Sequence, residues 1–223
     1  MPSHPTHYHE SRYAATLSGV IALRMMGLFL ILPVFMILAV EVPGYTPLAA
    51  GVAMGIYGLT QAALQQPFGW LSDRWGRRPV LLLGLSLFAL GGIVAAMGDS
   101  MAALIAGRAL QGCGAVAGVA MALAADVSRP EKRSIVMAVI GMGIGASFLV
   151  SMMASVPLAT LLGLGGLFWL TVLFAVAGIL LVLSVPAVTP RHATVPADES
   201  PATRPVWLLA ISVFLLHLVM TLL

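Results

Sequence analysis

Two arginines, Arg24 and Arg108, stand out because each lies inside a long apolar stretch of the sequence. In a membrane, a guanidinium at the centre of a helix costs about 3 kcal/mol on insertion scales unless it faces a partner or a water-filled cavity. Each arginine is therefore a candidate for a substrate or proton pathway. For Arg108 there is an alternative, since its long side chain can also reach the outer membrane interface, about 10 Å away along a helix.

Polar side chains at helical spacing form a second candidate group. Tyr57, Gln61 and Gln65 recur every four residues, which places them on one face of a helix. Such a stripe can line a cavity or can serve hydrogen bonding between helices, and the sequence leaves both possibilities open. His217 can titrate near neutral pH and joins the candidate pathway, with packing or hydrogen bonding as the alternative role.

The sequence lacks the residue sets that are typical of enzymes. It has no nucleophile with a base and an orienting group, no HExxH pair and no phosphate-binding P-loop. Cys113 is the single cysteine, which excludes an intrachain disulfide and a cysteine metal cluster. We therefore expect no catalytic residue, no metal site and no cofactor.

The composition places these candidates in a membrane protein. Hydrophobic residues make up 60% of the 223 residues and charged residues only 9%, whereas about a quarter of an ordinary soluble domain is charged. A soluble globule has too little polar surface at this composition, so the lipid bilayer must be the solvent. The net charge of +3 comes from short cation clusters between apolar runs, which argues against nucleic-acid binding.

Apolar runs of the length needed to cross a hydrocarbon layer of about 30 Å recur along the chain. We expect six membrane-spanning helices, at 17–40, 47–69, 79–98, 101–125, 134–157 and 164–186. They divide the chain into a cytoplasmic tail at 1–13, a six-helix bundle at 14–187, a cytoplasmic linker at 188–205 and a partial seventh helix at 206–223. The last run stops without a polar flank, so we expect a truncated chain.

The distribution of cations predicts the orientation. Cations cluster before the first span, in alternate loops and in the linker, whereas the opposite loops carry Glu41 and Asp99. The positive-inside rule therefore places the N-terminus and the linker in the cytoplasm. The cations on this side are Arg12, Arg74, Arg77, Arg78, Arg129, Lys132, Arg133, Arg191 and Arg204.

Arg24 and Arg108 also suggest an internal repeat. Each follows the start of its span, the first and the fourth, by about two helical turns, and each is followed by a nearby glycine. Because these two spans run in opposite directions, the pattern indicates an inverted three-plus-three repeat.

The loop between the second and third spans, Gly69-Trp70-Leu71-Ser72-Asp73-Arg74-Trp75-Gly76-Arg77-Arg78-Pro79, carries the most specific motif. A plain topogenic loop needs cations but no fixed spacing. The order here resembles the signature loop of the major facilitator superfamily, G-x-L-x-D-R-x-G-R-R. That resemblance implies a conformational latch between two transporter halves, and the implied latch residues are Gly69, Asp73, Arg74, Gly76, Arg77, Arg78 and Asp126. For Asp126, at the cytoplasmic end of the fourth span, solvation at the membrane interface is the alternative role.

The fourth span narrows the resemblance. Its Gly107-Arg108-Ala109-Leu110-Gln111-Gly112 is similar to the R-x-x-Q-G motif of drug:H+ antiporters (DHA1), which adds Gln111 to the candidate pathway. The first two spans resemble the YajR-like subgroup of that family. The fifth span departs from the family pattern, since Ala154-Ser155-Val156-Pro157 stands where antiporters carry a glycine–proline pair, and the six expected spans contain no carboxylate.

The resemblance implies a secondary active transporter that works by alternating access and exports small molecules in exchange for protons across a bacterial inner membrane. Its implied partners are the lipid bilayer, a small-molecule substrate, protons and a missing C-terminal six-helix half. The alternative is a truncated six-helix membrane scaffold or assembly partner that does not transport.

Overall fold

The described part of the chain consists of helices and their connections. The computed structural model describes residues 7–128 and 130–184, and within these ranges it contains no strand. The expected linker, the partial seventh helix and His217 lie outside the described residues. In chain order the helices are α1 (His7–Ile31), α2 (Phe35–Leu38), η1 (Ala39–Glu41), α3 (Pro47–Trp75), α4 (Arg77–Met97), α5 (Met101–Cys113), α6 (Ala117–Val127), η2 (Pro130–Lys132) and α7 (Arg133–Ser184).

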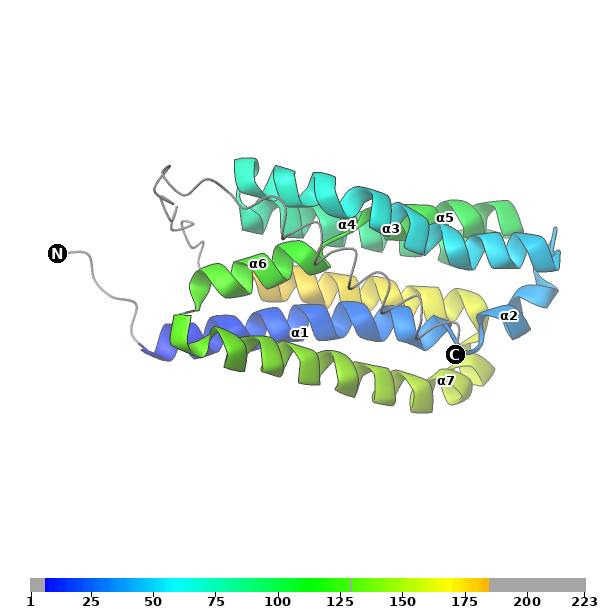
Figure 1. The fold of residues 1–223 in the computed structure, drawn as a ribbon. Coiled ribbons are helices and arrows are strands. Elements are labelled where there is room, and N and C mark those ends of the chain that lie inside the picture. The colour runs from blue at the N-terminus through cyan, green and yellow to red at the C-terminus, as the bar shows by residue number, and fades with distance from the viewer. Residues whose placement is uncertain (1–6, 129, 185–223) are drawn as a thin grey trace, which may run out of the picture. The chain divides into compact units, whose positions relative to one another are not determined.

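By length and composition, four helical segments of the described residues can cross a membrane, and the bent pair Ala15–Ile31 with Phe35–Glu41 can form a fifth. The longest segment, α7, has 52 residues and is non-helical at Gly163, where φ is 65°. Glycine adopts this left-handed conformation without the steric cost of a Cβ. Figure 1 shows α7 turning back on itself, so its two arms account for the expected spans at 134–157 and 164–186.

The first expected span differs from the prediction at both ends. The helix α1 begins at His7, so part of the expected tail at 1–13 is helical, because a helix can continue beyond the hydrocarbon layer into water. After Ile31 the chain bends by 47° before Phe35. Pro33 lies in this bend and has no N–H for a helical hydrogen bond.

The fourth expected span, 101–125, is interrupted near its middle. It ends as α5 at Cys113 and resumes as α6 at Ala117. Within the gap, the backbone N–H of Val116 donates to the carbonyl of Gly114, two residues back, at 2.8 Å. The predicted span still corresponds to one candidate membrane span, Met101–Val127, but its backbone is interrupted. An apolar run indicates a span without showing whether its backbone is continuous.

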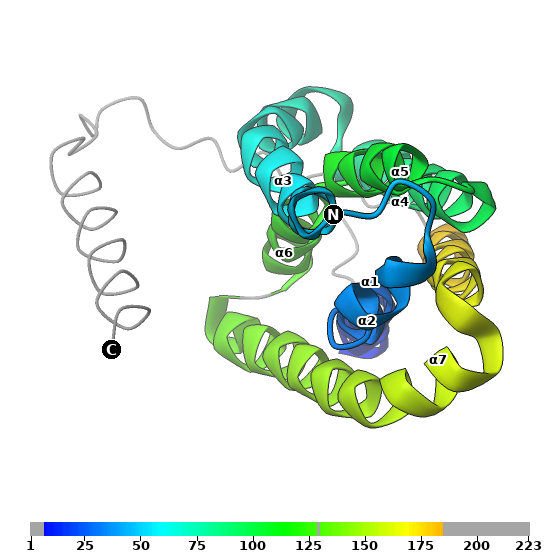
Figure 2. The same ribbon diagram turned by 90° about the vertical axis from the view of Figure 1, so that its right-hand side faces the viewer.

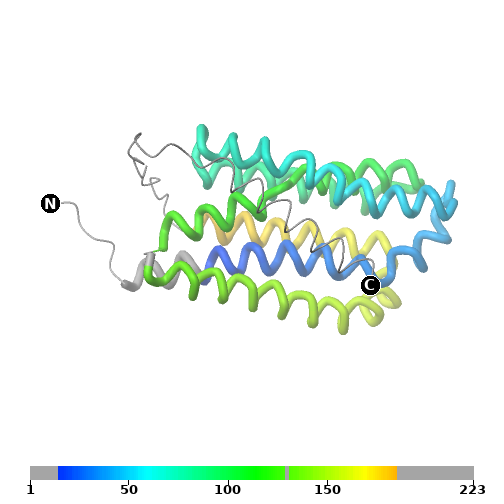
Figure 3. The backbone as a smooth tube through the Cα atoms, viewed as in Figure 1, coloured from blue at the N-terminus to red at the C-terminus, as the bar shows by residue number. Residues whose placement is uncertain are grey.

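The helix α1 packs mainly against α7 and also contacts α6. Figure 2 looks along the helices and shows α1 inside the bend that the two arms of α7 form. The tube in Figure 3 shows α3, α4 and α5 on one side of α1 and the first arm of α7 on the other. On their side, α5 packs against both α3 and α4.

Three serines join the first arm of α7 to α1, in what we call the serine seam. Each serine hydroxyl donates to a backbone carbonyl of α1, and both donors and acceptors recur every four residues. The bonds run from Ser147 to Ala22, from Ser151 to Met26 and from Ser155 to Leu30, at 2.9, 3.1 and 2.7 Å. Hydrogen bonds of this kind and small side chains both favour close helix packing in lipid, where the hydrophobic effect between helices is weak.

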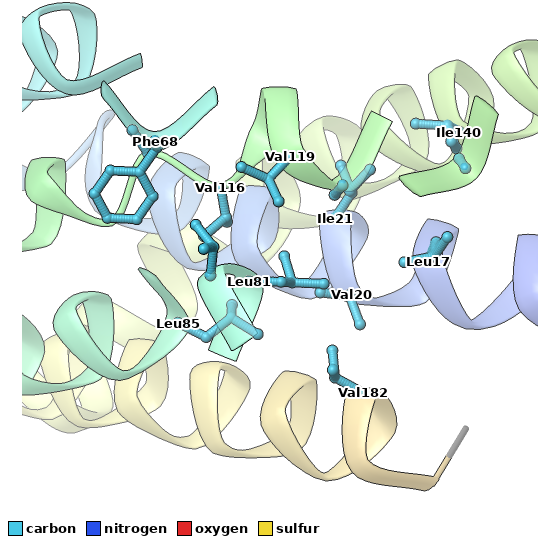
Figure 4. Close-up of a cluster of buried hydrophobic side chains, with 14 residues drawn as sticks. Leu17, Val20, Ile21, Phe68, Leu81, Leu85, Val116, Val119, Ile140 and Val182 are labelled. Atoms are coloured by element: carbon cyan, nitrogen blue, oxygen red, sulfur yellow. The ribbon is translucent and has the colours of Figure 1, made fainter. Parts of the chain in front are cut away.

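Apolar side chains form two large clusters at different depths of the bundle, and a smaller third cluster comprises Tyr57, Phe88, Ala89 and Ala175. The loop-end cluster lies near the junction of α3 and α4 and is shown in Figure 4. Its labelled members are Leu17, Val20, Ile21, Phe68, Leu81, Leu85, Val116, Val119, Ile140 and Val182. The bend-end cluster lies near the α1–α2 bend and includes Leu30, Ile31, Phe35, Leu104, Leu167 and Phe168.

Candidate functional site

A layer of polar side chains separates the two apolar clusters. Along α1, Arg24 follows Ile21 of the loop-end cluster and precedes Leu30 of the bend-end cluster. Along α5, Arg108 follows Leu104 of the bend-end cluster and precedes the break that leads to the loop-end cluster. We define this central polar layer as Arg24, Tyr57, Gln61, Arg108, Gln111 and Thr171.

Arg24 of α1 is held by neutral acceptors. Its Nη2 donates to Tyr57 Oη at 3.2 Å, to Gln61 Oε1 at 2.8 Å and to the carbonyl of Gly114 at 3.1 Å. Gly114 lies in the break between α5 and α6, so Arg24 supplies a donor to a non-helical carbonyl. The Arg24 guanidinium carbon also lies 5.6 Å from the centre of the Phe88 ring. Through this one side chain α1 contacts α3, α4 and the break in the fourth span.

Arg108 of α5 begins a second chain of contacts. Its Nη1 donates to Gln111 Oε1 at 3.1 Å, and Gln111 Nε2 donates to Thr171 Oγ1 on α7 at 3.1 Å. The guanidinium carbon of Arg108 lies 4.5 Å from the centre of the Tyr57 ring. Only 1% of Arg108 is exposed, so the structure places its side chain inside the bundle and not at the outer interface.

Neither buried arginine has a carboxylate partner among the described residues. Arg77 forms ion pairs with Asp73 and Asp126, and both pairs lie at the loop end. The acids Glu41 and Asp99 lie at the other end, where they line a cavity of about 370 Å³. Three buried nitrogens, Nε and Nη1 of Arg24 and Nε of Arg108, have no hydrogen-bond acceptor within the described ranges 7–128 and 130–184. A buried N–H group without an acceptor lowers the stability of the folded state. These three N–H groups are therefore available to donate to a ligand that supplies acceptors.

The predicted stripe on the second span is only partly gathered into the layer. Tyr57 is buried and Gln61 half-buried, and both accept hydrogen bonds from Arg24. Gln65 is exposed one turn further on and lies against Gly118 of α6. The equal spacing of the three residues predicted a shared face, but the inward face at Gln65 is already occupied by α6.

Arg77 is the centre of the predicted latch. Its guanidinium contacts Asp73 Oδ1 at 2.6 Å and Asp126 Oδ2 at 3.1 Å, which joins the α3–α4 junction to the end of α6. Ser72 adds a third contact, since Arg77 Nη1 donates to its hydroxyl at 2.6 Å. The hydroxyl in turn donates to the carbonyl of Gly69 at 2.7 Å. The predicted latch residues Gly69, Asp73, Arg77 and Asp126 thus form one connected group.

The other predicted latch residues have separate roles. Gly76 turns the chain between α3 and α4 with a φ of 93°, a value that favours glycine. The Arg74 guanidinium stacks at 4.6 Å on the ring of Trp70, which is 60% exposed. Arg78 donates to the carbonyl of Leu183 on the second arm of α7 at 3.1 Å.

Several hydroxyl groups that the motifs did not indicate also belong to the site. Thr171 completes the Arg108 chain, Thr60 donates to the carbonyl of Ala109 across α3 and α5 at 3.0 Å, and Ser72 binds Arg77. Isolated hydroxyls of this kind give no pattern in the sequence. The serine seam does leave one, because its three serines recur every four residues inside an apolar run.

Known proteins resemble this chain in sequence. A model described as Major Facilitator Superfamily matches residues 17–223. The inner membrane transport protein YajR of Escherichia coli K12 is 44% identical over 176 residues, which cover 79% of this chain and 39% of that protein. An uncharacterized transporter of Buchnera aphidicola subsp. Schizaphis graminum is 36% identical over 182 residues, or 82% of this chain and 46% of the relative. Multidrug resistance protein D of E. coli K12 is 48% identical over 69 residues, which cover 31% of this chain and 18% of that protein.

Solved structures resemble the fold. The human organic anion transporter MFSD10 (TETRAN) superposes with a TM-score of 0.66 at 24% identity, covering 82% of this chain and 48% of that one. A mutant of the peptide transporter POT in complex with sulfate superposes with a TM-score of 0.72 at 15% identity, covering 98% of this chain and 50% of that one. The chain thus spans about half the length of these structures and less than half of the curated relatives described above.

Proposed function

Because the chain belongs to the major facilitator superfamily, we propose that it forms the N-terminal half of a secondary transporter that exports small molecules in exchange for protons. The observation that carries this proposal is the convergence of Arg24 and Arg108 on Tyr57 inside the bundle. Ionisable residues buried in membrane spans mark substrate or ion pathways by default. Here they come from the two helices that an inverted repeat would relate, and such repeats build their sites at mid-depth.

The latch group supports alternating access. Arg77 holds Asp126 and Asp73 together, but the side chain of Asp73 is still 62% exposed, against 31% for Asp126. An exposed carboxylate at the end of α3 can change partners when a second half approaches. We propose that this exchange stabilises one of the two access states, in keeping with domain closures in which small contacts bias a two-state element.

Proton exchange and export are the finer parts of the proposal. The name of the relative Multidrug resistance protein D supports export of drug-like solutes. In the described residues, the carboxylates of the candidate membrane-spanning helices, Glu41, Asp73 and Asp126, lie near helix ends. Proton binding would therefore fall to these groups or to acids elsewhere in the transporter. The name of YajR and the cation distribution support a multi-pass protein of the bacterial inner membrane with a cytoplasmic N-terminus.

The names of the relatives favour transport over a non-transporting scaffold. A direct test uses everted membrane vesicles that contain a form of the protein with both six-helix halves. Respiration acidifies the vesicle interior, and a fluorescent pH dye reports proton release when a candidate solute is added. We expect at least one drug-like solute in a panel to release protons, and Arg108→Gln to abolish the release.

Arg133→Gln is the matched control, because Arg133 is an exposed arginine outside the central polar layer that donates to the Ala125 carbonyl. It should leave the response unchanged. Identical traces from vesicles with and without the transporter, over a panel of cationic, neutral and anionic solutes, would reject proton-coupled export.

A further inference from the structure

The two buried arginines create an excess of positive charge around a single aromatic side chain. Arg24 donates to the hydroxyl of Tyr57, and Arg108 lies over the ring of the same residue. The acceptors that they reach are all neutral, namely a phenol, two amide side chains and a backbone carbonyl. Buried charges are normally paired, since an uncompensated charge in a low-dielectric interior is strongly unfavourable. An anion is the missing chemical partner.

The free donors indicate what kind of anion fits. Arg24 retains Nε and Nη1, and Arg108 retains Nε, each shielded from solvent and without an acceptor. Both arginines are more than nine-tenths buried, with exposed fractions of 2% and 1%. A carboxylate or phosphate presents several oxygens and can accept from more than one guanidinium nitrogen. We propose that Arg24 and Arg108 together bind one oxyanion beside Tyr57.

Gln61 lies on the route by which the anion reaches the two arginines. It is half-buried, whereas Arg24, Tyr57, Arg108 and Gln111 are buried. Its Oε1 accepts from Arg24 Nη2 at 2.8 Å, the shortest of the three bonds that this nitrogen makes. An incoming oxyanion replaces this neutral acceptor with a charged one, which adds the attraction between opposite charges to a bond whose donor is already charged. Gln61 thus accepts from Arg24 in the absence of the anion, and the anion replaces Gln61 as the acceptor when it binds.

The oxyanion has two possible sources with the same chemistry, a transported solute or a carboxylate side chain of the second six-helix half. Naming it as a solute group rests on the proposed function and makes anionic solutes the substrate class. The binding of an oxyanion does not rest on the proposed function, and a measurement that involves no transport tests it. Failure of proton-coupled export would leave the oxyanion site standing, and the reverse also holds.

The test measures thermal unfolding of the purified 223-residue protein in detergent with sodium benzoate or sodium phosphate, against sodium chloride at equal ionic strength. We expect at least one oxyanion to raise the unfolding midpoint in a saturable way. Arg24→Gln and Arg108→Gln should each weaken the apparent affinity about tenfold or more, since each removes a charged donor. Arg133→Gln should leave it unchanged.

Gln61→Ala keeps the test decisive if an arginine variant does not fold. Removal of the competing acceptor should tighten oxyanion binding several-fold, opposite in direction to the arginine variants. Repeating the titration on a form with both halves separates the sources: stabilisation of both forms assigns the site to a solute, and stabilisation of the 223-residue protein alone assigns it to a side chain of the second half. No saturable shift in either form, or a shift that persists in both arginine variants, overturns the site.

Discussion

The guanidinium carbon of Arg108 lies 4.5 Å from the centre of the Tyr57 ring, within the range of a cation–π contact. Because the hydroxyl of that ring accepts from Arg24, one aromatic side chain joins both intramembrane arginines. The arrangement depends on the planar guanidinium, which can face a ring and donate in its own plane at the same time. Charge alone does not reproduce it.

Arg108→Lys tests that dependence. The ammonium keeps the charge but loses the planar stack on Tyr57 and weakens the bond to Gln111. We expect the free energy of unfolding to fall by about 1–2 kcal/mol, and transport by a form with both halves to fall on the order of tenfold. Chemical denaturation in detergent and a vesicle assay measure the two effects. Full activity of the lysine variant would show that a positive charge alone is sufficient at this position.

Asp73→Asn tests the latch. The amide removes the charge that pairs with Arg77, while every cation that sets the orientation remains. We expect transport by the form with both halves to fall strongly, with membrane insertion unchanged. Asp126→Asn should have a similar effect because Arg77 contacts both acids. If the Asp73 variant is present in the membrane in normal amounts and its transport is unchanged, Asp73 does not act as a latch residue.

Ser151→Ala tests the serine seam at its middle bond, the hydroxyl donated to the Met26 carbonyl. Interhelical hydrogen bonds in membranes average about 0.6 kcal/mol, so we expect a loss of that order in the free energy of unfolding. Thr160→Ala is the control, because Thr160 is exposed and donates within its own helix to Pro157. Equal losses in the two variants would argue against a special contribution of the seam.

Gly112→Ala tests the close approach of α5 to α3. A Cβ at Gly112 would collide with the Tyr57 carbonyl and the Thr60 hydroxyl, so α5 would have to move away. We expect destabilisation of about 1–3 kcal/mol. Gly58→Ala should be neutral or slightly stabilising, since nothing lies within 4 Å of a Cβ there. A similar result for both variants, measured by thermal unfolding, would contradict the packing at Gly112.

The sequence predicted the features that depend on local composition. Apolar runs indicated where membrane helices lie, and the positions of Arg24 and Arg108 within two of those runs indicated the polar layer. The resemblance of the loop at 69–79 to the family signature implied Asp73 and Arg77 as latch residues, and the same family implied Asp126 at the end of the fourth span. Such signals are readable because one helix or one loop carries each of them.

The features that the sequence did not reveal depend on pairs of distant segments. The seam joins residues that are 125 positions apart, and the Thr171 hydroxyl matters only because α7 brings it to Gln111. For Gln65, by contrast, the sequence predicted a shared role that the structure does not show. Its spacing matches Tyr57 and Gln61, but it lies against Gly118 of α6. Periodicity shows which face a residue shares with others, but the helix opposite that face decides its role.

The position of Arg24 in the chain also affects how the protein is made. The acceptors of Arg24 follow it by 33, 37 and 90 residues, so α1 is synthesised before any of them exists. An arginine at the centre of a helix opposes partition into lipid by about 3 kcal/mol, which takes several leucine or isoleucine residues to offset. We therefore expect α1 to partition weakly by itself at the translocon. Its stable integration would be completed when the nascent chain delivers α3 and the break that follows α5.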